Sequence, residues 1–590
     1  MEPLTLYAAG LAAMAASGVS LPALRARLQL SAAKHRSLQG HPRLSQRIAA
    51  LVPFYEYDED RFFCADDAPA ELASRRRVAF ERLSCRLHMR APETIERSED
   101  VAGSIADLQF VNAYRVPFQF SRYVSQRLPV GALVRDSCGV FVRDLDGNAS
   151  YDLTGSYGVN VFGYDFYKSC IDAGIERVRS LGPVLGSYHP VVEENVQRLK
   201  DISGLDEVSF HMSGTEAVMQ AVRLARYHTG RSHVVRFSGA YHGWWDGVQA
   251  GVGNPRPPRD VYTLKDLDAR TLHVLRTRRD IACVLVNPLQ CLHPNASPPS
   301  DAALVGGGDN GDRRTVPDRA EYGHWLKALR EVCTERSIPL IFDEVFVGFR
   351  IACAGAQEYF GVRADLVTYG KTVAGGLPIG VLCGTRGLMR RFRQDRPLDV
   401  CFARGTFNSH PYVMGAMNEF LRRLDEPAIQ RGYATLEATW NRRARLMNEC
   451  LAARQLPVRV ANLVSIWTIE YTAPSRYHWM FQYYLRAEGL ALSWIGTGRL
   501  IFSHNYSDAD FRAVVDRFVA AAAAMRDDGW WDGPPSLSSA TIRKQVLREM
   551  IRVRARFLNR QSDRRARPAA GRAARDDRSS RRETGRSGSS

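Results

Sequence analysis

The stretch "IPLIFDEVFVGFR" (338–350) is an apolar run that ends in two carboxylates, Asp343 and Glu344. A continuous apolar run bounded in this way predicts a strand that is buried on both faces. A buried ionised carboxylate is costly unless a cation or several hydrogen bonds satisfy it. The first question about the chain is therefore which positive group meets Asp343 at the end of this strand.

Four further apolar runs predict strands: "EVSFHM" (207–212), "HVVRF" (233–237), "ACVLVN" (282–287) and "DLVTYG" (365–370). Amphipathic stretches at 216–228 and 320–336 predict helices between them. Strands that are almost wholly apolar and alternate with helices indicate an α/β fold, with a mainly parallel sheet covered by helices on both faces. A later α/β portion, within 401–530, predicts a second and smaller domain.

The remaining segments differ in character from this alternating part. Residues 1–105 read as a helical extension, in which 71–87 is an amphipathic helix and 6–24 a weakly apolar helix without the basic start of a signal peptide. The turn "DGN" predicts a hairpin within 139–153, and 293–319 predicts a surface loop. We divide the chain into 1–105, 106–205 (contributing to the small domain), 206–400 (the large domain), 401–530 and 531–590.

Composition narrows the classes of function. The net charge of +17 is partly due to residues 563–590, which hold nine arginines against four acids and predict a disordered tail. No face interleaves basic and aromatic residues, so we expect no nucleic-acid partner. Eleven scattered cysteines without a CxxC pair indicate a cytoplasmic protein without disulfides or a metal site. No apolar run is long enough to span a membrane.

Residues that follow the predicted strands carry the candidate chemistry, because ligands bind at the carboxyl ends of strands in open parallel sheets. "MSGTEA" (212–217) has the form of a capping box, Ser213 with Glu216, and opens a helix whose first amides can bind a phosphate or merely be capped. "GAYHGWW" (239–245) offers a ring that stacks on a flat ligand or packs under a loop. Lys371 ends another strand, either as a nucleophile or as the partner of a carboxylate.

Together these parts match the requirements of pyridoxal 5'-phosphate. A lysine amine forms a Schiff base with its aldehyde, and a carboxylate keeps its ring nitrogen protonated so that the ring withdraws electrons. The expected positive partner of Asp343 is then the cofactor's pyridinium and not a protein side chain.

From about residue 110 to 525 the sequence resembles the class III pyridoxal-phosphate aminotransferases, and within them the glutamate-1-semialdehyde 2,1-aminomutase branch. The motifs that carry this resemblance are "DLDGNASYDLTGSYG", "SFHMSGTEAVMQAVRLAR", "GAYHGWWDG", "IFDEVFVGFR", "YGKTVAGGLPIGVLCG" and "RGTFNSHPYVMGAM". The resemblance implies fold type I of the pyridoxal-phosphate enzymes, in which a large domain holds the cofactor.

The resemblance also implies roles for individual residues. Lys371 is the Schiff-base lysine and Asp343 the partner of the pyridinium, while Val345 and Tyr241 pack on the two faces of the ring. The phosphate is bound by Ser213, Gly214 and Thr215, and by Thr406 of a neighbouring subunit, which makes the active unit a homodimer; Gln290 lies near the phenolic oxygen.

Two departures from the family pattern stand out. Asn287 and Cys291, in "NPLQC", replace a usual acid and a usual glycine, and "GYDFY" (163–167) replaces a "GHAHP"-like turn at the substrate entrance.

The sequence leaves the exact reaction open. Arg499 occupies the place of an arginine that binds a substrate carboxylate in many class III aminotransferases, and the same resemblance puts Ser156 and Tyr157 on the substrate side. We therefore expect an aminotransferase acting on a small-molecule amino donor and a carbonyl acceptor. The alternatives are a glutamate-1-semialdehyde 2,1-aminomutase and a non-catalytic scaffold. An acceptor bound to an acidic carrier protein is compatible with the basic charge.

Overall fold

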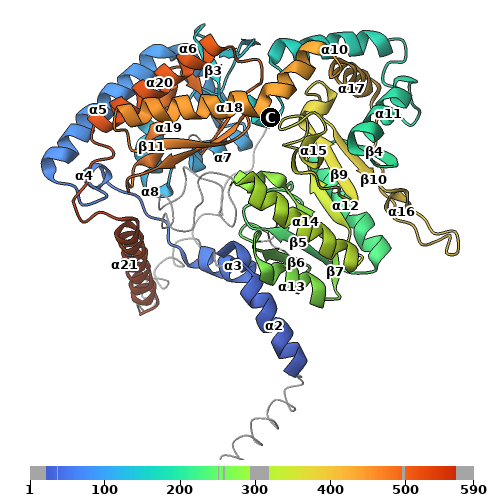
Figure 1. Ribbon diagram of the computed structural model, residues 1–590. Helices are drawn as coiled ribbons and strands as arrows, with labels where there is room; N and C mark the ends of the chain where they lie inside the picture. Colours follow the sequence, from blue (N-terminus) through green and yellow to red (C-terminus); the bar gives the residue numbers. More distant parts are fainter. Residues whose placement is uncertain are drawn as a thin grey trace, which may run out of the picture.

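A computed structural model describes residues 21–35, 38–249, 251–254, 256, 259–292, 318–493 and 498–566. A larger and a smaller α/β unit lie side by side, and helices of residues 59–127 pack around the smaller one (Figure 1). The expected loop up to residue 317, the first part of the 6–24 helix and the tail from 567 lie outside the described residues.

The larger unit is built on a seven-stranded sheet, and its mainly parallel α/β character is confirmed. All strands run parallel except β10, which is antiparallel to both neighbours. Two strands, β6 and β10, were not predicted from the sequence. The strand order is β4 (Glu207–His211), β10 (Gly380–Gly384), β9 (Leu366–Gly370), β8 (Leu340–Asp343), β7 (Ile281–Val286), β5 (His233–Phe237) and β6 (Val261–Leu264).

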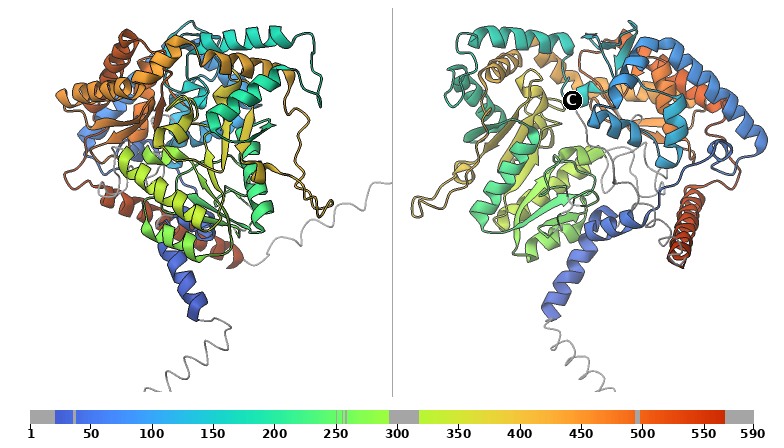
Figure 2. Two further views of the ribbon diagram at one scale, coloured as in Figure 1. Left: turned by 45° about the vertical axis from the view of Figure 1, so that its right-hand side comes forward. Right: turned by 180° about the vertical axis from the view of Figure 1, so that it is seen from behind.

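Helices cover both faces of this sheet (Figure 2), and alternating side chains of β7 pack toward opposite faces. Cys283 and Leu285 of β7 belong to the cluster formed with α12 (Gly214–Thr229). Val284 and Val286 belong to the other cluster, which includes the buried face of α14 (Arg319–Glu335). Because both faces are covered, every residue of β7, β8, β9 and β10 is buried, which explains why these strands lack polar alternation.

Further helices surround the larger unit. The closest helix pair is α10 and α17, in which Gly174 and Gly415 allow the two backbones to approach so closely that a Cβ on either would overlap the other helix. The helices are α10 (Tyr164–Val178), α11 (Val191–Ser203), α13 (Ala269–Thr277), α15 (Gly355–Phe360), α16 (Arg386–Met389) and α17 (Pro411–Arg423), with the 3-10 turns η2 (Pro288–Leu292) and η3 (Lys371–Ala374).

The smaller unit combines two short sheets. One is antiparallel and contains β11 (Val458–Leu463), β12 (Ile466–Tyr471) and β14 (Arg499–Ile501). The other contains the expected hairpin, β2 (Phe141–Arg143) and β3 (Ala149–Asp152), with β1 (Asp136–Cys138) and β13 (Leu490–Ala491). Its helices are α18 (Pro427–Ala453), η4 (His478–Met480), α19 (Phe481–Ala487) and α20 (Asp508–Asp527). Since β13 pairs with β3, the segment before residue 205 shares a sheet with the later one, and we retain the fivefold division as a proposal.

Both ends of the described chain are helical. α5 packs on α19 of the smaller unit, and α2 packs on α13 of the larger one. α21 lies at the periphery (Figure 1), with Ile542 and Val546 buried. No helix of the described part is long and apolar enough to cross a membrane. The helices are α2 (Leu21–Ala33), η1 (Leu38–Gly40), α3 (Pro42–Leu51), α4 (Glu59–Phe63), α5 (Ala70–Arg90), α6 (Pro92–Ala102), α7 (Ala106–Tyr114), α8 (Phe118–Arg127) and, near the C-terminus, α21 (Ser539–Ala566).

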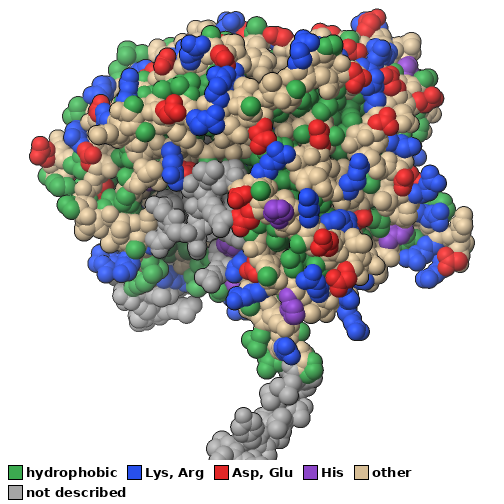
Figure 3. Space-filling model, in the orientation of Figure 1, with side chains coloured by type: hydrophobic (Ala, Val, Ile, Leu, Met, Phe, Trp, Pro, Cys, Tyr) green, Lys and Arg blue, Asp and Glu red, His purple; other side chains and the backbone are tan. Residues whose placement is uncertain are grey.

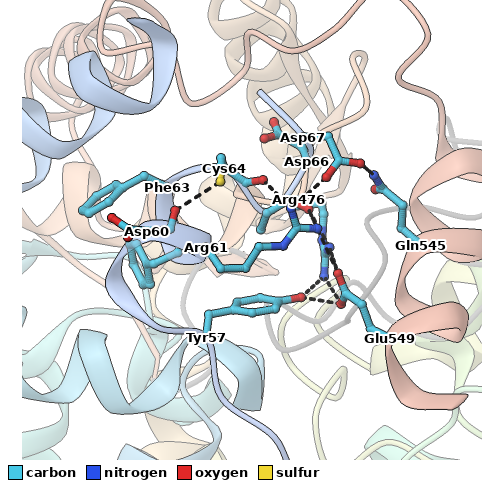
Figure 4. Close-up of polar contacts among 12 residues, drawn as sticks. Tyr57, Asp60, Arg61, Phe63, Cys64, Asp66, Asp67, Arg476, Gln545 and Glu549 are labelled. Carbon is cyan, nitrogen blue, oxygen red and sulfur yellow. Dashed lines mark hydrogen bonds and ion pairs between the residues drawn. The ribbon is translucent and has the colours of Figure 1, made fainter. Parts of the chain in front are cut away.

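A polar network joins three distant segments of the chain (Figure 4). Glu549 of α21 accepts a hydrogen bond from the Tyr57 hydroxyl at 2.6 Å and pairs with Arg61 and with the almost fully buried Arg476, each at 3.1 Å. Because Arg476 belongs to the smaller unit, one carboxylate connects that unit to both terminal segments.

A second ion pair beside this network is fully buried. Arg76 of α5 donates to both oxygens of Asp66, at 2.9 and 2.8 Å, and its guanidinium also donates to the backbone carbonyls of Phe63, Gly529 and Asp532. All of its donors are used, which is the condition under which a buried charge pair is tolerated.

We predict that Arg76→Met lowers the free energy of unfolding by about 3–5 kcal/mol, because it leaves the Asp66 carboxylate buried without its cation. Chemical denaturation measures this difference. Arg75→Met, which removes an exposed pair with Asp532, is the matched control and costs less than about 1 kcal/mol. Equal losses in the two variants would show that the buried pair has no special role.

Candidate active site

A pocket of about 490 Å³ lies where the parallel strands of the large sheet end. The segments that follow β4, β5, β7, β8 and β9 line it, and β14 of the smaller unit adds one side chain. This is the place at which open parallel sheets bind ligands. The sequence-predicted residues that line it are Ser213, Gly214, Thr215, Tyr241, Asp343, Val345, Lys371 and Arg499.

The start of α12 forms one wall of the pocket. Ser213 is the N-cap, and its hydroxyl accepts a hydrogen bond from the Glu216 N–H at 3.3 Å. The Glu216 carboxylate accepts from the Met212 N–H at 2.9 Å, so the reciprocal bond forms one residue earlier than in the predicted capping box. The amides of Gly214 and Thr215 have no acceptor within the helix and lie at its positive end. This turn therefore offers N–H donors to an anion such as a phosphate.

Asp343 lies at the end of β8 with its side chain buried. Nδ1 of the buried His242 lies 2.7 Å from one carboxylate oxygen of Asp343. The other oxygen accepts longer hydrogen bonds from the Val345 N–H, at 3.2 Å, and the Thr368 hydroxyl, at 3.3 Å. His242, taken in the sequence only as a possible stacking ring, thus hydrogen-bonds to Asp343, and the cofactor's pyridinium stays the predicted positive partner of this carboxylate.

The neighbouring carboxylate, Glu344, is held differently. It is buried away from the pocket lining and accepts hydrogen bonds from the N–H groups of Ala356, at 2.5 Å, and Gln357, at 3.3 Å, in the first turn of α15. A Cβ at Gly355 would overlap this carboxylate, and the positive φ of 74° there also favours glycine. Burial raises the pKa of Glu344 to about 8. The two acids of the opening motif thus have separate roles, one toward the pocket and one toward a helix.

Lys371 begins the 3-10 turn after β9 and points toward the ring of Phe346, with its Nζ 5.7 Å from the ring centroid. Its φ of 51° is left-handed, a strained conformation for a residue with a side chain. Burial lowers the pKa of Lys371; Asp343 opposes this effect and the positive charge of Arg350 adds to it. A lysine with a lowered pKa has more of its amine neutral, which is the form that acts as a nucleophile or base.

Several lining residues were not assigned to the site from the sequence. Phe346, Trp244 and Leu289 supply apolar surface. Asn287, the departure from the family acid, also lines the pocket and donates from its amide to the Tyr241 carbonyl at 3.3 Å. It therefore positions the segment that carries the expected stacking ring. Asn287 directly follows β7 at the same edge of the sheet, and this position could have identified it as a lining residue from the sequence.

Among the described residues, Arg499 of β14 is the only arginine that lines this pocket. Burial lowers its pKa to about 10, and no carboxylate in the described part of the chain forms an ion pair with it. A guanidinium in this position can bind a planar carboxylate with two parallel hydrogen bonds.

Two predicted residues lie outside the lining. The side-chain amide of Gln290 donates to the carbonyl of Ser238 at 2.6 Å, which fixes the loop after β5 from below the pocket surface. Thr406 is exposed on the segment between β10 and α17.

Ser156 and Tyr157 also lie outside the lining, in the short turn α9 (Gly155–Gly158). The Ser156 hydroxyl lies 3.0 Å from the hydroxyl of Tyr164, which donates to Asp152 at 2.8 Å. Tyr157 is exposed. The substituted "GYDFY" turn thus contacts the substrate-side segment through Tyr164.

Comparison with known proteins identifies the family. Residues 123–522 match the model of the family described as aminotransferase class-III. Glutamate-1-semialdehyde 2,1-aminomutase of Chlorobaculum tepidum is 36% identical over 310 residues, covering 51% of this chain and 68% of that protein. The enzyme of the same name from Nitratidesulfovibrio vulgaris is 30% identical over 399 residues, covering 64% of this chain and 89% of that protein.

Solved structures show the same fold. A β-phenylalanine aminotransferase from Variovorax paradoxus superposes with a TM-score of 0.60 at 23% identity, covering 77% of this chain and 98% of that chain. A glutamate-1-semialdehyde aminomutase from Pseudomonas aeruginosa gives a TM-score of 0.60 at 19% identity, covering 77% and 99%. The predicted resemblance is confirmed: the chain belongs to the class III aminotransferase family.

Proposed function

We propose that this enzyme is an aminotransferase that moves an amino group from a carboxylate-bearing donor to a keto or aldehyde acceptor. The observation that carries the proposal is the position of Arg499, a half-buried arginine that lines the same pocket as Lys371. A buried cation without an acid to pair with is costly, and a substrate carboxylate removes that cost.

The cofactor of the enzyme is pyridoxal 5'-phosphate, and the lining residues fit it. A Cβ at Gly214 would lie 2.6 Å from a methyl group of Val345, so only glycine lets the start of α12 approach the segment after β8. The helix start would hold the phosphate, Asp343 the ring nitrogen and Lys371 the aldehyde carbon. When bound, the cofactor withdraws electrons from the substrate carbon that loses its proton.

The side chains of the pocket then have distinct tasks. Lys371, with its lowered pKa, can take a proton from the α-carbon of the substrate and return it. His242 and the Thr368 hydroxyl hold the Asp343 carboxylate in place. Phe346 supplies apolar surface beside the Lys371 amine and reduces the access of water to it.

The alternative reaction is the intramolecular transfer of an amino group, as in a glutamate-1-semialdehyde 2,1-aminomutase. The observation that favours it is the name shared by curated relatives at 30–36% identity. Both reactions use the same lysine, so they differ in whether the pocket retains its intermediate or exchanges it for a second substrate. We place the aminotransferase first because a carboxylate-binding arginine serves successive carboxylic acids.

We also propose a homodimer in which Thr406 completes the neighbouring phosphate site. Large apolar side chains are exposed on the segments around it, and Arg404 links one of these segments to the Gly186 carbonyl. Exposed apolar surface of this kind marks protein interfaces. The exposed residues are Val184, Tyr188, Phe392, Leu398, Val400, Phe402 and Phe407.

A carrier protein as the bearer of the acceptor has less support. On the face drawn in Figure 3, acidic and basic side chains of the described residues are interspersed. Such a surface gives an acidic partner no single site of attraction. We therefore propose small molecules as donor and acceptor.

We predict that Lys371→Ala abolishes turnover and the visible absorbance of the cofactor-loaded enzyme, because no other lysine lines the pocket. Absorbance spectra and borohydride reduction followed by peptide mass mapping measure the loss. Lys327→Ala, which removes an exposed lysine of α14, should leave both unchanged. A reducible link to protein in the Lys371 variant would mean that the lysine is misassigned.

A donor screen separates the two reactions and tests Arg499. Amino acids should convert the cofactor to its amino form with release of a keto acid. In Arg499→Met, kcat/KM should fall about 100-fold for donors with a carboxylate and little for simple amines, since a charge-assisted pair is lost. Arg459→Met, on the edge strand of the same sheet, is the control.

Nitrogen migration within an amino aldehyde without any external donor would instead favour the mutase. Equal losses for donors with and without a carboxylate would remove Arg499 from the substrate site.

For the dimer, light scattering should give twice the mass of the chain. Phe402→Asp, which places a charge in the exposed apolar segment, should shift the protein toward the monomer by at least about tenfold in dissociation constant. Val78→Asp, at an equally exposed apolar residue of α5, should not. A wild-type protein that remains monomeric would contradict the proposal.

A further inference from the structure

The turn Gly155–Gly158 has an unusual backbone. Its four residues have φ values of 51°, 46°, 57° and 93°, and Ser156 and Tyr157 among them are not glycines. A left-handed conformation costs such residues about 1–2 kcal/mol each. Strain of this kind persists only where surrounding contacts hold it in place, and it occurs often at functional sites.

This turn lies directly against the reactive lysine. A Cβ at Gly158 would lie 2.3 Å from the ring of Phe346 and 3.5 Å from Cδ of Lys371. The next residue, Val159, lines the pocket. The conformation of the turn therefore sets how much space surrounds Lys371.

Arg350 holds this turn from inside the protein. Its side chain is fully buried, and one guanidinium nitrogen donates to the carbonyls of Gly158, at 3.2 Å, and Asn160, at 2.7 Å. The other donates to the carbonyl of Phe502, at 2.7 Å, and to the Ser465 hydroxyl, at 3.3 Å. All four acceptors are neutral. The buried Asp152 carboxylate also acts on Arg350 electrostatically and raises its pKa, although burial lowers it more.

The acceptors belong to two different walls of the pocket. Gly158 and Asn160 flank Val159 on the lysine side, whereas Phe502 directly follows β14, the strand that carries Arg499. No neutral side chain presents this fork of donors, and a lysine ammonium lacks its planar geometry.

We propose that Arg350 is a positioning residue that fixes the left-handed turn to the end of β14, and so sets the separation between Lys371 and Arg499. The inference rests on the proposed function, because it takes Lys371 as the reacting amine and Arg499 as the carboxylate-binding group. It adds a residue that touches neither the cofactor nor the substrate.

The charge of Arg350 has a second effect on the same lysine. Arg350 lowers the pKa of Lys371, in the direction opposite to Asp343. The other titratable groups of the pocket wall are His242, which bonds to Asp343, and Tyr241 and Arg499. Removal of the Arg350 charge should raise the pKa of Lys371, because one positive charge that opposes its protonation is gone.

Other contacts hold the same segment on both sides. On the side of β14, the Ile501 N–H donates to the Leu153 carbonyl at 2.9 Å and the His504 N–H to the Val161 carbonyl at 2.6 Å. The Val161 N–H donates to the Tyr167 hydroxyl, which lies 2.5 Å from the hydroxyl of Thr372, next to Lys371. The Thr154 hydroxyl accepts from the Ser156 N–H. These bonds should keep the protein folded when Arg350 is replaced. The expected result is therefore a folded protein in which the segment around Val159 is more mobile.

The test compares Arg350→Met and the milder Arg350→Lys with Arg443→Met. Arg443 is the matched control, because it is also buried and donates to a backbone carbonyl, that of Tyr506, but pairs with Asp508 and has no hydrogen bond to the turn. Hydrogen exchange on the cofactor-free protein measures the amides of Val159 and Asn160, which donate to Ser156 and Gly155 carbonyls. A pH titration of visible absorbance on the loaded protein measures the lysine.

Both Arg350 variants should exchange these amides at least about tenfold faster, and Arg350→Met should raise the apparent pKa of the visible band by about half a unit or more. KM for carboxylate donors should rise more than kcat falls. The control should show none of these changes even where its stability drops. Unchanged exchange and titration in the Arg350 variants would overturn the inference.

The two proposals fail in different ways. A wild-type protein without a visible band would contradict the proposed function, while the exchange measurement would still decide whether Arg350 holds the turn.

Discussion

The structure depends on one carboxylate at the end of a fully buried strand. Asp343 cannot leave the core, because β8 lies between β7 and β9 in the sheet. Its charge must therefore be satisfied at the edge, by His242 and two weaker donors, and we propose the ring of the cofactor as its further partner. The loops that line the pocket surround Asp343, since each of them begins where a parallel strand ends. Strand order thus determines which side chains meet.

The charged side chains of the pocket come from different parts of the structure. The carboxylate is on the large sheet, Arg499 comes from the smaller unit, and the lysine lies close to both walls. The buried amine of Lys371 experiences opposing fields from Asp343 and Arg350, and burial together with Arg350 prevails over Asp343. The same cavity thus holds an amine with a lowered pKa and the guanidinium of Arg499.

Much of this arrangement could be read from the sequence. Five strands and the residues at their ends were predicted, because apolar runs and the rule for parallel sheets are local or topological. The short strand β6 and the glycine-flanked β10 were missed, since neither has a run long enough to stand out. The hydrogen bonds of His242 to Asp343 and of Arg350 to the Asn160 carbonyl join residues more than 100 positions apart. The periodicity of a sequence carries no information about such contacts. Gln290 matches the family motif in sequence, but its side-chain amide donates to the Ser238 carbonyl and does not line the cavity.

The network around Arg476 has a consequence for the order in which the molecule forms. Tyr57 and Arg61 emerge early from the ribosome, whereas Glu549 is made almost 500 residues later. Until then the guanidinium groups of this cluster lack their shared carboxylate. The early helices therefore cannot reach their final packing during synthesis. Until translation ends, the nascent chain exposes apolar surface that makes it prone to aggregation.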